Sequence, residues 1–267
     1  MNRPAHLPDF LDPPLDEVVL GVQFSPIQDY SSVFAGNVHS LFQSEYPMVA
    51  EQPLLERRFE TFGGGNVQAG PRIQVGQPPI GSRLWFLSQD ENHLLQFQAD
   101  MFLSNWRRRP NTQQYPRFEG LSEAFERNLR QLEDFFRDSF EAKIEVNQAE
   151  VSYINVIPVD GFADAEARLE VWNGGKIDVE SVNLSFSEII RDKDGKPFAR
   201  LLHQVTSVYT MDGKERALRL SLSFKGKPQN DTIGEAMDFL GRGREAIVLR
   251  FKEVTTSKAH KAWGIIE

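Results

Sequence analysis

The 267-residue chain contains no cysteine, which excludes disulfide bonds, thiolate catalysis and cysteine-ligated metal sites. It has no apolar run of the length that a membrane helix needs, and its N-terminal region carries prolines and acids where a signal peptide has an apolar core. Basic residues are fewer than acidic ones, 30 against 38, and the net charge of −8 disfavours binding of nucleic acid or anionic membrane by the whole surface. We therefore expect a cytoplasmic protein that does not contact a membrane.

Motifs for catalysis are also absent. The five histidines include no pair at metal-ligand spacing, and the glycine-rich residues 63–81 lack both the spacing and the lysine of a phosphate-binding loop. No nucleophile elbow and no zinc-protease motif occurs. The sequence thus predicts no catalytic residue, no metal and no cofactor. We expect a binding protein rather than an enzyme, while the 38 acidic residues leave a catalytic carboxylate pair open.

Hydrophobic periodicity predicts two successive units of sheet and helix. The first unit, residues 1–144, has predicted strands at 17–24, 56–62, 83–90 and 93–106 and predicted helices at 33–42 and 118–140. The second unit, residues 145–267, has predicted strands at 149–159, 182–187, 198–210 and 218–225 and predicted helices at 164–172 and 232–254. The predicted fold class is α+β, with two tandem β-α-β(3-4)-α units whose antiparallel meander sheets pack on long helices. This element order is similar to that of TATA-binding-protein-like and helix-grip folds.

Three positions within these elements carry more specific expectations. The strand at 17–24 is apolar on both faces, which indicates a central, buried strand. Gly241 and Gly243 interrupt a helical pattern, and because glycine weakens a helix, we expect a kink or a close backbone approach there. His203 shares a strand face with Leu201 and Val205, so we expect it to be partly buried and hydrogen-bonded.

Several stretches of the chain resemble motifs of one family of sporadically distributed, functionally uncharacterised prokaryotic proteins of similar length. These stretches are PPLDEVVLGVQF (13–24), FQADMFLSNWRRR with YPRFEGL (97–121), VSYINVI (151–157) and AHKAWG (259–264). The family often has arginine where this chain has Ala99 and Ser152, so an anion-binding role of those two positions is not expected here. The resemblance implies one full-length unit and the patchy occurrence of mobile or defence-associated genes, but no reaction.

The first candidate site is a basic and aromatic cluster that follows the strand at 93–106. The cluster comprises Trp106, Arg107, Arg108, Arg109, Tyr115 and Arg117. Guanidinium groups beside aromatic rings suit phosphate contact and base stacking. Consecutive arginines in a strand, however, point to alternate faces. Both an anion or nucleic-acid site and a solvated, ion-paired strand end are consistent with the pattern.

The second candidate site is the polar face of the meander in the second unit. It comprises Asn183, Ser185, Ser187, Ser221 and Ser223. Small polar side chains make a low surface that another protein or an extended segment can approach, and a plain solvent-exposed face is the alternative.

Our leading expectation is a non-enzymatic cytoplasmic interaction protein with a protein partner encoded nearby. The resemblance implies an antitoxin, accessory or sensor role in a mobile or defence-associated module. A small-molecule binder with an apolar cavity between sheet and helix, and a nucleic-acid or anion binder through residues 106–109, remain open.

Overall fold

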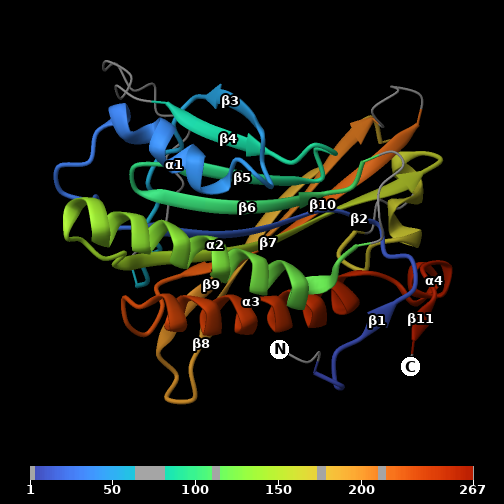
Figure 1. Ribbon diagram of the computed structural model, residues 1–267. Helices are drawn as coiled ribbons and strands as arrows, with labels where there is room; N and C mark the ends of the chain where they lie inside the picture. Colours follow the sequence, from blue (N-terminus) through green and yellow to red (C-terminus); the bar gives the residue numbers. More distant parts are fainter. Residues whose placement is uncertain (1–3, 64–81, 110–114, 173–178, 210–214, 267) are drawn as a thin grey trace, which may run out of the picture.

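A computed structural model describes residues 4–63, 82–109, 115–172, 179–209 and 215–266 (Figure 1). These residues form a nine-stranded antiparallel sheet in the order β3-β4-β5-β6-β2-β7-β10-β9-β8. The strands are β2 (Leu15–Phe24), β3 (Met48–Gln52), β4 (Arg83–Leu87), β5 (His93–Gln98), β6 (Met101–Arg107), β7 (Val146–Val159), β8 (Asn183–Arg191), β9 (Pro197–Tyr209) and β10 (Arg216–Gly226). The predicted α+β class with antiparallel pairing is confirmed.

Strands β2 and β7 pair at the centre of the sheet. Strands β3 to β6 lie on one side of this pair and β8 to β10 lie on the other, so both predicted units contribute to one continuous sheet. Residues 18–24 of β2 are all buried, which confirms the prediction of a central strand. The boundary between the units at residue 144 stays a prediction.

Three helices cover one face of the sheet: α1 (Ala35–Phe42), α2 (Arg117–Phe140) and α3 (Ile233–Val254). Helix α1 packs through Phe42, whose ring lies 5.7 Å from the ring of Phe102 on β6. Phe125 of α2 stacks on the same Phe102 ring at 5.9 Å, and α3 lies beside α2 over β7 and β10 (Figure 1). The aromatic core therefore lies between the helices and one face of the sheet. No helix of the described residues covers the opposite face, which is called the helix-free face here.

Helix α3 ends at a small cap formed by both termini of the described chain. Strand β1 (Asp9–Phe10) pairs with β11 (Ile265–Ile266), next to the short helix α4 (Ser257–Ala262). Phe10 is buried against Phe251 of α3 and Trp263, at 5.6 and 6.2 Å between ring centroids. This cap fixes the N-terminal segment, which sequence predicts only as an extended lead-in.

The two glycines of α3 have different surroundings. A Cβ atom at Gly243 would lie 2.6 Å from side-chain carbons of both Phe224 and Val151, whereas a Cβ atom at Gly241 would meet nothing within 4 Å. The expected close approach is therefore confirmed at Gly243, where α3 lies directly on the sheet.

Three predicted elements are wrong. The strand at 93–106 is a hairpin, because Gln98 pairs with Met101 and the chain turns at residues 99–100. The predicted helix at 164–172 is a 3₁₀ helix, η2 (Phe162–Ala167), followed by a bridge between Leu169 and Thr255. Residues 56–62 form no strand. They belong to a segment that crosses the sheet on its helix-free face, as described below. Residues 64–81 of the glycine-rich stretch are not among the described residues.

Candidate functional site

The helix-free face of the sheet carries a row of glutamines. Gln98 of β5 is aligned with Met101 of β6, which is aligned with Gln23 of β2, which is aligned in turn with Gln148 of β7. Because residues directly opposite in adjacent strands share a face, these side chains form a line across four strands. We call Gln98, Gln23 and Gln148 the glutamine row. All three are buried, at 4%, 6% and 9% exposure.

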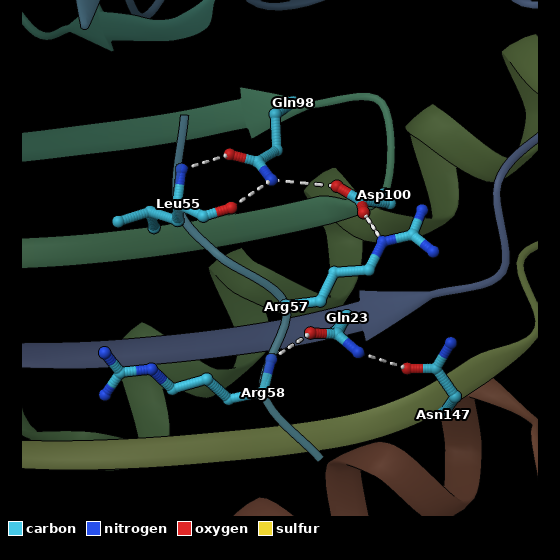
Figure 2. Close-up of polar contacts among 7 residues, drawn as sticks. All are labelled: Gln23, Leu55, Arg57, Arg58, Gln98, Asp100 and Asn147. Carbon is cyan, nitrogen blue, oxygen red and sulfur yellow. Dashed lines mark hydrogen bonds and ion pairs between the residues drawn. The ribbon is translucent and has the colours of Figure 1, made fainter. Parts of the chain in front are cut away.

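Residues 53–62, here called the crossing segment, pass over the glutamine row (Figure 2). The side chain of Gln98 accepts a hydrogen bond from the Leu55 backbone N–H at 3.0 Å and donates to the Leu55 carbonyl at 3.1 Å. Gln23 accepts from the Arg58 backbone N–H, and Gln148 accepts from the Glu60 backbone N–H, both at 3.3 Å. The row therefore holds the main chain of the crossing segment.

The spacing of these contacts requires an extended chain. Strands β5 and β7 are three positions apart in the sheet, which corresponds to about 14 Å at the usual spacing of ~4.8 Å. The five residue steps from Leu55 to Glu60 span at most about 17 Å when fully extended. The crossing segment is thus close to full extension and lies across the strands rather than along them, which is why it adds no strand to the sheet.

Two of the four charged side chains of the crossing segment, those of Arg57 and Glu60, form ion pairs with the sheet. Arg57 pairs with Asp100 in the β5–β6 turn, and Asp100 also accepts a hydrogen bond from Gln98 at 2.8 Å. Glu60 pairs with Arg200 of β9 at 2.6 Å, with side chains only 17% and 13% exposed. Asp100 and Arg200, which hold Arg57 and Glu60, are called the anchors. Since each anchor has the opposite charge to its partner, the face binds a basic and an acidic side chain that are three positions apart in the segment.

A cavity of ≈ 400 Å³ lies between the crossing segment and the sheet. Its lining includes Gly21, Leu103 and Ala149 on the sheet side and Arg58 on the segment side. Leu55 and Phe59 of the segment are 36% and 53% exposed, so these two side chains contribute few apolar contacts. The segment is therefore bound mainly by polar contacts above incompletely filled space.

The arginine cluster is divided among several partners. Arg107 lies over the Trp85 ring at 5.5 Å, and burial lowers the pKa of its guanidinium. Arg108 pairs with Asp12 at 3.6 Å, and its main-chain N–H donates to the Asp16 carbonyl. The side chains of Arg107 and Arg108 thus contact other residues of the same chain.

Three further members of the cluster, Trp106, Tyr115 and Arg117, lie on the helix side. Trp106 is buried and packs on Tyr115 at 5.0 Å, and the Tyr115 hydroxyl lies 3.1 Å from that of Tyr153. Burial raises the pKa of the Tyr115 phenol well above its usual value. Arg117 pairs with Asp9 at 2.6 Å. The cavity in this region measures ≈ 60 Å³, which is about the volume of two water molecules.

The second predicted site shares the face of the glutamine row. Cross-strand alignment places Ser185 opposite Gln204 and Gln204 opposite Ser221. Ser187 and Ser223 flank Leu202 in the same way, and Asn183 is aligned with Thr206. The five predicted residues therefore lie together on β8 and β10, beside the end of the crossing segment at β9.

His203 lies on the opposite face and is hydrogen-bonded, as predicted, but it is fully rather than partly buried. Its Nε2 is 2.7 Å from Glu188, which also accepts from Arg250, and its ring stacks on Phe186 at 4.3 Å between centroids. Burial lowers the pKa of the His203 imidazole, although Glu188 acts in the other direction. Among the described residues, no three His, Asp or Glu side chains gather as a metal site.

The sequence indicates part of this site but not its key contacts. Alternation along the strands places Gln96 and Gln98 on a polar face, yet nothing marks the crossing segment as their partner. Leu55 and Gln98 are 43 residues apart, and Glu60 and Gln148 are 88 apart. Glutamines that lie on predicted strands between apolar residues are the one available signal.

Comparison with protein-family models and with curated proteins gives no match. Among solved structures, TBP of Methanococcus jannaschii is similar at 14% identity, over 90% of this chain and 98% of that chain, with a TM-score of 0.26. A TM-score this low supports no argument about fold or function. No helix in the described ranges is both long and apolar enough to span a bilayer.

Proposed function

We propose that this chain is a non-enzymatic interaction protein that binds an extended segment of a partner protein on the helix-free face of its sheet. The observation that supports this is the contact between Gln98 and Leu55, in which one side chain bonds both the N–H and the C=O of an extended residue. Gln23 and Gln148 repeat the main-chain contact along the row. Side chains that bind the main chain hold a segment with little dependence on its sequence.

The serine face extends the proposed surface beyond the crossing segment. Ser221 and Ser223 are half-buried, and Ser185 and Ser187 are exposed. Their small side chains form a flat polar border on both sides of β9. A partner segment that follows the path of residues 55–60 would leave its remaining length over this border. We place the protein in the cytoplasm, with a partner encoded nearby, in an antitoxin, accessory or sensor role.

A peptide supplied in trans tests this proposal. In a variant called the linker protein, a ten-residue Gly/Ser linker replaces the crossing segment. A labelled peptide with the sequence of residues 53–62 is titrated with this variant, and binding is measured by fluorescence anisotropy. We predict saturable binding. Gln98→Ala should weaken it by roughly 5- to 150-fold, because two hydrogen bonds contribute about 1–3 kcal/mol net.

Gln131 provides a matched control. Its side chain donates to the Leu41 carbonyl on the helix side, so Gln131→Ala makes the same chemical change away from the proposed face. Equal binding by this variant and by the linker protein is expected. Absence of peptide binding by a linker protein that retains its cooperative unfolding transition would disprove the proposed function.

One observation favours a second candidate, a small-molecule binder. The cavity of ≈ 400 Å³ lies within the range of about 300–1,000 Å³ that ligand sites occupy. It lies on the helix-free face, and not between sheet and helix where sequence suggests it. A metabolite that raises the melting temperature of the intact protein, but not that of the linker protein, which lacks the segment side of the cavity, would favour this candidate over peptide binding.

The nucleic-acid alternative is tested through the arginine cluster. Since Arg107 packs on Trp85 and Arg108 pairs with Asp12, we expect no retention on heparin at low salt. Retention that is lost in the Arg107→Ala/Arg108→Ala/Arg109→Ala variant would support nucleic-acid binding instead.

The strand order also supports a finer view of the fold. Proceeding outward from the central pair, β2 is followed by β6, β5, β4 and β3, and β7 is followed by β10, β9 and β8. In each unit a long helix, α2 or α3, follows the last strand of the meander. We infer that the units are tandem repeats in a TATA-binding-protein-like arrangement, in which η2 takes the place of α1 in the second repeat.

A further inference from the structure

We infer that the crossing segment is an internal pseudo-ligand, that is, a part of the chain that occupies the binding face until a partner segment displaces it. We also infer that the partner segment is extended and has the sequence pattern basic–large apolar–any residue–acidic. This inference rests on the proposed function and names the partner that fits the face. It assigns the basic residue to the place of Arg57, the apolar residue to that of Arg58 and the acidic residue to that of Glu60.

The charged positions follow from the two anchors. Asp100 is 7% exposed and is held by the Gln98 amide, so it presents a fixed negative charge at one end of the row. Arg200 presents the positive charge at the other end, where it also donates to the Thr61 carbonyl at 3.0 Å and lies over the Phe62 ring at 5.5 Å. Oppositely charged anchors at the two ends fix the direction of a bound segment.

The apolar position follows from the cavity. The side chain of Arg58 lies along the sheet between β2 and β7 (Figure 2) and lines the cavity with Gly21 and Leu103. Glu150, the acid that the sheet contributes to the lining, already pairs with Lys225 at 2.7 Å, so the sheet side needs no basic side chain to balance it. Of the two acids on the segment side, Glu56 and Glu60, Glu60 pairs with Arg200. A large apolar side chain would remove more apolar surface from water there than the charged Arg58 does.

A partner segment can replace the crossing segment on this face if it binds tightly enough to compete with it. The crossing segment is tethered at β3, so its effective concentration is about millimolar, and a partner must compete with it. The residue of the segment at the cavity, Arg58, is charged and exposed, so it covers little of the apolar surface of the sheet there. A partner with an apolar residue there can therefore outcompete it despite the tether.

Three labelled peptides test this inference on the linker protein. The first has the sequence of residues 53–62, the second carries Arg58→Leu, and the third carries Glu60→Lys. We expect the Arg58→Leu peptide to bind about ten-fold more tightly. The Glu60→Lys peptide should bind about ten-fold more weakly, and the Arg200→Glu variant of the linker protein should restore its binding.

The intact chain supplies the comparison for displacement. It should bind the Arg58→Leu peptide roughly ten-fold more weakly than the linker protein does, because its own segment competes. Equal affinity of the intact and linker proteins for the Arg58→Leu peptide would disprove that the crossing segment acts as a pseudo-ligand. If both altered peptides bind the linker protein as tightly as the peptide of residues 53–62, the proposed sequence pattern of the partner is disproved. These outcomes differ from a failure of the proposed function, in which the linker protein binds none of the three peptides.

Discussion

Replacement of Gln98 by alanine should release the crossing segment and expose it to trypsin. The change removes two hydrogen bonds to Leu55, at 3.0 and 3.1 Å. Each bond contributes about 0.5–1.5 kcal/mol net, so their loss lowers the free energy needed to release the segment by about 1–3 kcal/mol. The population of the open state, in which the segment has left the sheet, then rises by roughly 5- to 150-fold. Trypsin cuts after Arg57 or Arg58 only when the segment leaves the sheet, so the rate of that cut follows the open population.

The assay is limited proteolysis under native conditions, with the cut site identified by mass. Gln131→Ala should leave the rate of cleavage after Arg57 and Arg58 unchanged. If Gln98→Ala is cleaved there no faster than the unaltered chain, the hydrogen bonds to Leu55 do not hold the segment, and the reasoning is refuted.

Further predictions concern the helix side of the sheet. Gly243→Ala should be less stable than Gly241→Ala by about 1–3 kcal/mol in urea unfolding, because both gain helix propensity but only the methyl group at 243 meets side chains at 2.6 Å. Burial lowers the pKa of His203 from 6.5, so the unfolded chain binds more protons and the free energy of unfolding falls as pH drops through 6.5. In His203→Gln this fall, measured by urea unfolding between pH 7 and 5, should be smaller. Equal slopes would contradict the assignment.

Strand faces are the part of the fold that sequence predicts well, because alternation is a local signal. The buried run of β2 and the shared face of Ser221 and Ser223 both follow from spacing alone. The turn at residues 99–100 escapes prediction, since it contains no glycine and the apolar residues continue on both sides. Its Asp100 is instead held by contacts with Gln98 and Arg57.

The candidate site depends on long-range contacts that spacing does not reveal. Residues 56–62 are extended, as their composition suggests, but their hydrogen bonds go to glutamine side chains and not to a neighbouring strand. Likewise, the local sequence shows three adjacent arginines, whereas two of them contact distant residues, Arg107 the indole of Trp85 and Arg108 the carboxylate of Asp12. These partners are set by the order of strands in the sheet.

The most direct test of the central claim is an NMR titration of the ¹⁵N-labelled linker protein with the peptide of residues 53–62. The side-chain amide signals of Gln23, Gln98 and Gln148 should shift together and saturate, while the signal of Gln131 stays in place. Shifts confined to residues of the helix-covered side, or no shift in the three glutamines despite binding, would contradict the claim that this face holds an extended main chain.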